Sequence, residues 1–343
     1  MITPRQLEVL ADAAIRLGSG TIELTSRANV QLRGITDTAT VARMAIDAGL
    51  LPSATHERVR NILASPLSGR AGGLADVRPW VTELDRLLQG DPELAGLPGR
   101  FLFGIDDGRG DVAGLGADAG VRVGGDGVAL LLAGRDTGIR LEPSAAVDAL
   151  GTVARRFLRR RGTAWRVGEL PDPDALLTGY PRAVPPGAVC EPGRAPVGWI
   201  GQDDGSVALG AAVPLGVLSA RQAQFVAAIG APVVITPWRS LLVCDLTESV
   251  ADTALRVLAP LGLVFDGTSR WLEVTSCVGS PGCERSRADV RAEAARTVES
   301  GTATGPVHGP VHFVGCERAC GRPPDSTVLV ATGDGYATLG RRP

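Results

Sequence analysis

Four of the six cysteines lie in the last quarter of the chain, at a spacing that suits a metal centre. They form two pairs, Cys277-Val-Gly-Ser-Pro-Gly-Cys283 and Cys316-Glu-Arg-Ala-Cys320, whereas Cys190 and Cys244 stand alone. Four thiolates are the ligand set of a [4Fe–4S] cluster. A zinc site is the alternative, but zinc sites favour cysteine pairs separated by two residues. The cysteines therefore predict a [4Fe–4S] cluster.

Arginines supply the second group of candidate functional residues. The stretch Thr25-Ser-Arg-Ala-Asn-Val-Gln-Leu-Arg-Gly34 alternates polar and apolar residues, which predicts a strand with its polar groups on one face. Guanidinium groups bind carboxylates through two parallel hydrogen bonds, so this face could hold an acidic substrate, although an ordinary solvated face would look the same. The candidates for substrate contact are Arg27, Asn29, Gln31 and Arg33, and more weakly Arg60, Arg70 and Arg239.

Composition narrows the class of protein. The 343 residues carry a net charge of -2 and are 44% hydrophobic, which gives no general attraction to nucleic acid or to an anionic membrane. No apolar run approaches a membrane-spanning length and no signal peptide is evident, so a cytoplasmic protein is expected. All 35 Lys+Arg positions are arginine. Any chemistry that needs a lysine ammonium group as proton donor is therefore absent.

The chain contains an internal repeat. The segment at Thr25 reappears at Thr236, an offset of 211, and Ser65-Pro-Leu-Ser-Gly reappears at Cys277, an offset of 212. Later matches at Asp76 and Asp289, Phe101 and His312, and Gly125 and Gly333 keep the same order. This alignment places Ser65 and Ile105 where the second half has Cys277 and Cys316. We therefore expect two homologous halves, of which only the second has the cysteines.

The coarse pattern within each half is helix, strand, helix and then a second module. Helices are expected over 5–17 and 38–50 around a strand at 22–35, and again over 219–229 and 249–260 around a strand at 232–246. This order predicts an internally duplicated α+β protein with ferredoxin-like pieces. A strand pair at 198–201 and 206–210 has no first-half partner, so a leading strand is expected to be missing there. The expected divisions are 1–53 and 197–268 (ferredoxin-like half-domains), 54–170 (module without cluster ligands), 171–196 (linker) and 269–343 (iron–sulfur module).

These motifs resemble the sulfite and nitrite reductase superfamily. The resemblance rests on residues 25–34, on the Cys-x5-Cys at 277–283 and on Gly-Cys-x3-Cys-Gly-Arg-Pro at 315–323, and it covers nearly the whole chain. It implies two pseudo-symmetric halves and a cluster on Cys277, Cys283, Cys316 and Cys320. In the superfamily, the cysteine matching Cys320 also bridges the cluster to the iron of sirohaem.

Within the superfamily, the chain is most similar to the short members of aerobic cobalamin synthesis, the precorrin-3B synthases. The stretches that carry this likeness are 63–69, 236–239 and 330–336. The likeness implies O2-dependent hydroxylation of precorrin-3A at C20 with closure of a γ-lactone. It also implies an electron donor, which the sequence does not identify, and a mononuclear non-haem iron. The histidines that could serve that iron are His56, His308 and His312, and no ligand set can be assigned among them.

Two other functions remain open at this point. A sirohaem-dependent sulfite or nitrite reductase would share the scaffold, but the assimilatory reductases are usually longer and use lysines at the anion site. A non-catalytic iron–sulfur electron carrier would share the cluster, but it has no need of a duplicated sheet lined with arginines.

Overall fold

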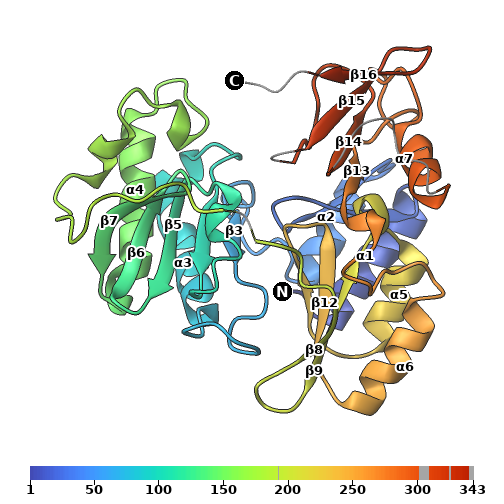
Figure 1. Ribbon diagram of the computed structural model, residues 1–343, viewed down its shortest axis with the longest axis horizontal. Coiled ribbons are helices and arrows are strands. Elements are labelled where there is room, and N and C mark those ends of the chain that lie inside the picture. The colour runs from blue at the N-terminus through green and yellow to red at the C-terminus, as the bar shows by residue number, and fades with distance from the viewer. Residues whose placement is uncertain (192, 301–308, 324–325, 340–343) are drawn as a thin grey trace. The chain divides into compact units, whose positions relative to one another are not determined.

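The computed structural model describes residues 1–191, 193–300, 309–323 and 326–339. The chain divides into two compact α+β units (Figure 1). The first unit comprises Met1–Ala48, Ala195–Ile200 and Ser206–Pro343, and the second comprises Gly49–Arg194 and Gly201–Gly205. The segments predicted to be ferredoxin-like thus lie mainly in the same unit as the cysteines. None of the described helices is long and apolar enough to span a bilayer.

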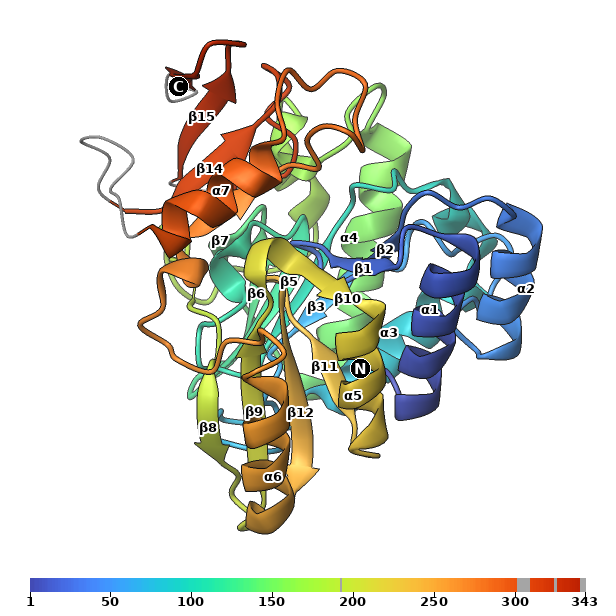
Figure 2. The ribbon, with the colours of Figure 1, turned by 90° about the vertical axis from the view of Figure 1, so that its right-hand side faces the viewer.

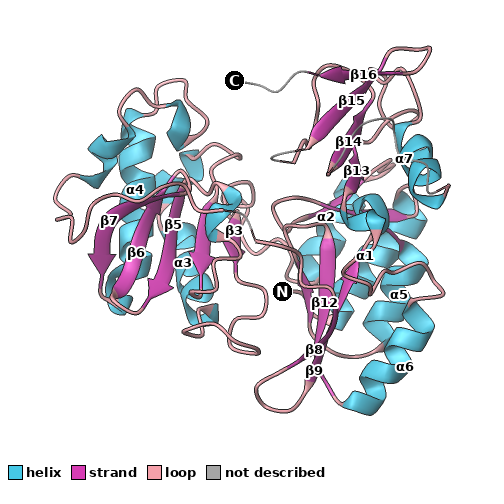
Figure 3. Cartoon of the chain, viewed as in Figure 1, coloured by secondary structure: helices cyan, strands magenta, loops and turns pink. Residues whose placement is uncertain are grey.

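The second unit is a five-stranded sheet covered by two helices. The strand order is β3-β4-β5-β6-β7, with β3, β4 and β5 parallel and the last two pairings antiparallel. Helices α3 and α4 lie on one face of this sheet (Figure 3), and Leu84, Phe157, Phe103 and Leu130 are fully buried between the layers. The elements are β3 (Ile62–Ala64), α3 (Arg78–Gly90), β4 (Phe103–Asp106), β5 (Ala119–Gly124), β6 (Gly127–Leu132), β7 (Arg135–Leu141) and α4 (Ala146–Arg160).

The first unit holds three sheets. Strands β10-β1-β2 form one, β11-β12-β9-β8 a second, and β13-β14-β15-β16 a third. Helix α1 packs beside α5, and α6 packs against β9 (Figure 2). The elements of the first two sheets and their helices are α1 (Pro4–Leu17), β1 (Thr21–Leu24), β2 (Val30–Leu32), α2 (Thr38–Asp47), β8 (Gly198–Gly201), β9 (Val207–Ala212), β10 (Val217–Ser219), α5 (Ala220–Ala228), β11 (Val233–Ile235), β12 (Ser240–Leu246) and α6 (Glu248–Leu258).

Two segments of the first unit repeat the same local structure. Helix α1 begins at a capping box of Thr3 and Gln6, and α5 begins at one of Ser219 and Gln222. The pairing is reciprocal as well. Strand β10, just before α5, pairs with β1, and Ile2, just before α1, bridges to Val233 of β11. The helices expected at 5–17, 38–50, 219–229 and 249–260 are all present within a few residues of their predicted bounds.

The prediction of one continuous strand over 22–35 is wrong. The segment is a hairpin, in which β1 and β2 pair antiparallel through Leu24 and Val30. The turn closes with a hydrogen bond from the Thr25 N–H to the Asn29 carbonyl (2.9 Å), and Ala28 takes a positive φ of 54°. The Thr25 hydroxyl also accepts from the Asn29 N–H at 3.1 Å. The side chains of 27 to 33 therefore do not alternate along one strand.

The segment predicted as a strand over 232–246 is divided in the same way. Strands β11 and β12 flank a turn at 236–239, in which the Thr236 N–H donates to the Ser240 carbonyl at 3.0 Å. Arg239 takes a φ of 54°, as Ala28 does, at an offset of 211 residues.

The third sheet of the first unit has the same strand directions as the sheet of the second unit. Strands β13, β14 and β15 are parallel, and β16 turns back antiparallel. The bounds are β13 (Val274–Ser276), α7 (Val290–Glu299), β14 (Val311–Val314), β15 (Thr327–Ala331) and β16 (Tyr336–Leu339). The Ser65 N–H donates to the Ile105 carbonyl, and the Cys277 N–H donates to the Phe313 carbonyl. This register corrects the alignment above: Ser65 does correspond to Cys277, but Ile105 corresponds to Phe313, so Cys316 corresponds to Gly108.

The segment expected to link the halves, 171–196, is held against the second unit. The N–H groups of Val184, Gly187 and Cys190 donate to carbonyls of Gly138, Asp136 and Gly134 in or beside β7. Leu176 and Leu177 are buried in the core of the same unit.

Candidate metal centre and substrate-binding residues

The four cysteines lie in the loops that follow two neighbouring parallel strands. Cys277 directly follows β13, and Cys316 lies two residues after β14. Cys283 is in the loop between β13 and α7, and Cys320 is in the loop between β14 and β15. Because the carboxyl ends of parallel strands meet at one edge of a sheet, this topology brings both pairs to the same edge. Cys277, Cys283 and Cys316 are partly buried, and Cys320 is exposed.

Backbone hydrogen bonds join the cysteine loops at Gly315. The Gly315 N–H donates to the Cys277 sulfur at 3.4 Å, and its carbonyl accepts from the Arg287 N–H at 3.0 Å. The Ser286 N–H donates in turn to the Cys283 carbonyl at 3.0 Å. A Cβ on residue 315 would lie 1.8 Å from the Ser286 hydroxyl, so only glycine fits here. The two loops that carry Cys277, Cys283 and Cys316 are thereby tied together.

The donor set fits an iron–sulfur cluster better than a closed zinc site. In tetrahedral zinc sites, sulfurs on bonds of about 2.3 Å lie about 3.8 Å apart. Among the described residues, no three cysteine, histidine or acidic groups that include a cysteine bring their ligand atoms within 4.8 Å of one another. The hydroxyls of Ser276 and Tyr336 are also buried without hydrogen-bond partners among these residues. Cys277 directly follows Ser276 and packs on the same apolar cluster as Tyr336.

Two side chains support the loop at Cys320. His312, which is fully buried on β14, lies with its Nε2 3.0 Å from the Cys320 carbonyl and its Nδ1 2.8 Å from the Thr275 hydroxyl. Arg239 donates from Nη2 to the Gly321 carbonyl at 2.9 Å. Burial lowers the pKa of His312 to about 4, with smaller contributions in the same direction from Arg239 and Arg322. No local pattern in the sequence indicates this arrangement, because the partners lie on different elements.

The polar residues predicted at 27–33 occupy different settings. Arg27 and Asn29 lie in the β1–β2 turn, and Gln31 is exposed on β2. Arg33 follows β2 and donates from Nε to the Glu23 carboxylate at 2.6 Å. Arg291 of α7 donates to the other oxygen of Glu23, also at 2.6 Å. The nearly buried Glu23 thus joins the β1–β2 hairpin to the helix that follows Cys283, and the charge of Arg33 already has a partner.

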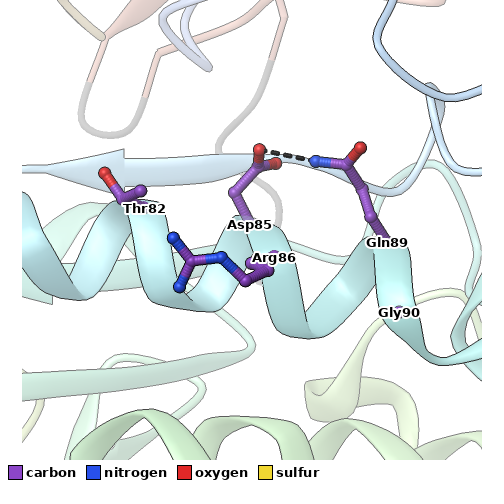
Figure 4. Close-up of a pocket in the computed structure, with 5 residues that line it drawn as sticks. All are labelled: Thr82, Asp85, Arg86, Gln89 and Gly90. Carbon is purple, nitrogen blue, oxygen red and sulfur yellow. Dashed lines mark hydrogen bonds between the residues drawn. The ribbon is translucent and has the colours of Figure 1, made fainter.

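Arg60 and Arg70 lie in the second unit. The other candidate arginines, Arg27, Arg33 and Arg239, lie in the first unit. Arg60 makes a double hydrogen bond to Asp85 of α3, at 2.5 and 3.0 Å. Asp85 lines a shallow surface pocket with Thr82, Arg86, Gln89 and Gly90, where Gln89 also donates to it (Figure 4). Arg70 is buried in the loop after β3. The ion pair with Asp85 explains why an arginine stands at position 60, without a role in substrate binding.

The structure offers no histidine pair for a mononuclear iron among the residues it describes. His56 and His312 lie in different units, and His308 is outside the described residues. The group of acids that comes closest to a metal site is Asp106, Asp107 and Asp111, in the second unit. Its oxygens already have donors. Asp106 accepts from four backbone N–H groups, Asp107 from Arg109, and Asp111 from the Ser65 hydroxyl at 2.6 Å.

Comparisons with known proteins define the class first. The family model of the nitrite/sulfite reductase ferredoxin-like half domain matches residues 1–46. The fold resembles that of the Mycobacterium tuberculosis NirA protein, with a TM-score of 0.78, 21% identity, and coverage of 98% of this chain and 71% of NirA. The chain therefore has the α+β fold of the sulfite and nitrite reductases.

A curated relative then gives the family. Over 359 aligned residues, the chain is 30% identical to a precorrin-3B synthase from Sinorhizobium sp., and the match covers 98% of this chain and 76% of the relative. The chain belongs to the precorrin-3B synthase family.

Proposed function

We propose that the protein is a monooxygenase of aerobic cobalamin synthesis that converts precorrin-3A to precorrin-3B. One atom of O2 enters as the hydroxyl at C20, and the other leaves as water after taking up two electrons and two protons. A ring acetate closes a γ-lactone on the macrocycle. The electrons come from a donor protein or nucleotide of unidentified kind.

The scaffold for this reaction is, in our proposal, an internal duplication. The matching capping boxes of α1 and α5 and the matching turns at Ala28 and Arg239 support it. So does the shared strand order of β3–β6 and β13–β16.

We further propose that Cys277, Cys283, Cys316 and Cys320 hold a [4Fe–4S] cluster. When bound, such a cluster supplies single electrons. The chain's own residues then have separate tasks. Gly315 donates its N–H to the Cys277 sulfur, and the loop ties at Gly315 bring three ligands together. A mononuclear iron remains part of the proposal only as a group whose ligands are unassigned.

The observation that carries the proposal is the contact between Arg239 and the Cys320 loop. Arg239 makes no ion pair with any described carboxylate, and burial lowers its pKa. A guanidinium keeps its proton in proteins, so a partly buried positive charge lies beside the cysteine loop. Precorrin-3A carries carboxylates all round its ring and would supply counter-charges. Arg27 and Arg33 are proposed to bind other carboxylates of the same ring, with Asn29 and Gln31 as neutral donors.

The test compares the two enzyme functions on one preparation. Protein purified without oxygen and given precorrin-3A, O2 and a reductant should yield one hydroxylated lactone per O2 consumed. The same protein, offered sirohaem and a strong artificial donor, should show negligible sulfite or nitrite reduction, because the chain has no lysine to deliver protons. Robust sulfite reduction would overturn the proposal. A stable cluster with neither activity would favour an electron carrier.

A further inference from the structure

The segment of Cys320 and Gly321 is held at two consecutive carbonyls by side chains from outside its loop. His312 contacts the Cys320 carbonyl at 3.0 Å, and Arg239 contacts the Gly321 carbonyl at 2.9 Å. Cys320 is the exposed member of the four cysteines, and its neighbours Ala319 and Gly321 both have positive φ, 47° and 78°. Within the loop, the Ala319 N–H donates to the Cys316 carbonyl at 3.2 Å, and the contacts at Cys320 and Gly321 add support from other elements.

His312 is hydrogen-bonded through both ring nitrogens, to the Cys320 carbonyl and to the Thr275 hydroxyl. A carbonyl oxygen only accepts, so Nε2 must carry the hydrogen that meets Cys320. The other ring nitrogen, Nδ1, lies 2.8 Å from the Thr275 hydroxyl. Thr275 lies on β13, two residues before Cys277. A chain of two hydrogen bonds therefore runs from the strand of the first cysteine to the carbonyl of the last.

Arg239 reaches the next carbonyl from the β11–β12 turn. Its side chain packs over Gly216, where a Cβ would lie 2.8 Å from its Cδ, so the stem is confined. A Cβ on Gly321 would lie 3.1 Å from the Arg239 Nη2, and the φ of 78° also favours glycine there. Glycine at positions 216 and 321 thus leaves room for the Arg239 side chain to reach the backbone.

We propose that His312 and Arg239 are positioning residues that hold Cys320 in place as a cluster ligand, with Thr275 fixing the orientation of the His312 ring. This inference rests on the proposed cluster. Groups that orient a ligand in this way tune the reduction potential of a metal centre and its resistance to loss. Neither residue needs to touch the iron, the cluster sulfides or the substrate for this role.

The experiment separates a hydrogen-bonding role from the filling of space. His312→Gln keeps a donor that can reach the Cys320 carbonyl, and His312→Leu fills similar volume without one. The readouts are the rate of cluster loss to a chelator without oxygen, the midpoint potential, and the width of the electron paramagnetic resonance signal of the reduced cluster. We expect the Gln variant to stay near the parent. The Leu variant should lose its cluster roughly three- to tenfold faster, the effect of one hydrogen bond, and should show a broadened signal.

The chain offers a matched control in the second unit. His56 is buried, with Nε2 3.0 Å from the Asp91 carbonyl and Nδ1 2.8 Å from the Thr55 hydroxyl. His56→Leu therefore removes the same kind of hydrogen-bonded histidine away from the cysteines and should leave all three readouts unchanged. If His312→Leu matches the parent while His312→Gln is worse, the histidine only fills space and the proposal is overturned.

A second pair of variants keeps the test decisive if His312 variants do not fold. Arg239→Gln keeps a donor and Arg239→Met keeps only the stem, and we expect faster cluster loss in the Met variant alone. Equal rates in both would overturn the role of Arg239. Failure of the proposed cluster would look different, because the parent protein would then contain no acid-labile sulfide.

Discussion

The sheet β13–β16 and the sheet β3–β7 share strand directions and register, yet their loops at the same edge are built differently. In the second unit, Ser65 stands at the position of Cys277 and donates to Asp111 at 2.6 Å. Asp106 accepts from four N–H groups of the following loop, and Asp107 accepts from the Arg109 guanidinium. The polar groups at this edge of the sheet are therefore hydrogen-bonded to one another.

The cysteine edge depends on partners from outside its loops. Cys320 is supported through His312 and Arg239, and the hydroxyls of Ser276 and Tyr336 have no partner among the described residues. The polar groups at the edge near Asp106, by contrast, find their partners within their own loops. We infer that the edge of β13–β16 serves as a cofactor site, whereas the matching edge of β3–β7 has a structural role.

The largest expected effect is the loss of one cysteine of the cluster. Replacing Cys277, Cys283, Cys316 or Cys320 singly by Ser should abolish the broad visible absorption of a [4Fe–4S] centre and most activity, because each iron needs its thiolate. Ser65 already occupies the Cys277 position in the second unit, so serine itself fits this frame. The measurement is the absorption spectrum with iron and sulfide counts. Cys190→Ser and Cys244→Ser should change neither, and zinc without sulfide in the parent would contradict the assignment.

The second expected effect is on the stability of the second unit, at the sheet edge around Asp106. Asp106→Asn replaces one accepting oxygen of a fully buried carboxylate by an amide donor, which leaves two of its four N–H partners without an acceptor. The free energy of unfolding of the second unit should fall by about 3 kcal/mol. Hydrogen exchange of β4–β7 measures this.

The matching control is Asp126→Asn, which removes an exposed ion pair with Arg140 and should leave the free energy of unfolding nearly unchanged. Cluster absorption per folded molecule should be unchanged in both variants. A loss of the cluster in Asp106→Asn without loss of stability would mean that the two edges are not independent.

The third effect concerns substrate binding by the first unit. Arg27→Ala and Arg33→Ala should each lower kcat/KM for precorrin-3A by roughly ten- to a hundredfold, as expected for one charge-assisted bond of about 1.5–3 kcal/mol. Arg33→Ala should also destabilise the hairpin, because it breaks the pair with Glu23. Arg159, exposed on α4 and paired with Glu93, is the control, and Arg159→Ala should be near neutral. Equal effects at all three positions would show that the arginines of the hairpin contribute no more to substrate binding than an exposed arginine elsewhere.

The sequence predicted what depends on local spacing. Helix α1 is set by residues close together in the chain, and it begins within one residue of its predicted start. The cysteine pairs are also a local pattern, and their role as cluster ligands stays a prediction. The β1–β2 turn was missed because apolar alternation continues through it and because Ala28, not glycine or asparagine, takes the positive φ. In the second copy, Pro237 at the turn was a usable signal.

What could not be predicted is tertiary. Nothing near Glu23 in the sequence indicates Arg291, and nothing near Cys320 indicates His312 or Arg239, because the partners come from separate elements. A strand alternation shows only that polar groups share a face. It does not show that one of them, Arg33, already has a counter-charge.

The smallest expected effect is a difference in pH dependence between the two edges. Burial raises the pKa of Asp111 to about 6, against the opposing hydrogen bond from Ser65. The folded state then binds this proton more tightly than the unfolded chain does. The stabilisation is therefore complete below about pH 4 and is lost as the pH rises through 6. Asp111→Asn keeps the acceptor for Ser65 but cannot ionise. The free energy of unfolding of the second unit, parent minus variant, should fall between pH 4 and pH 7 by on the order of 1–2 kcal/mol, since a shift of two pKa units sets an upper limit of about 3 kcal/mol. Ala319 stands at the equivalent position of the cysteine edge and has no group to titrate, so hydrogen exchange in β13–β16 should show no difference between parent and variant. Parallel pH curves for the second unit would show that Asp111 is ionised in the fold throughout, and that its edge tolerates the buried charge.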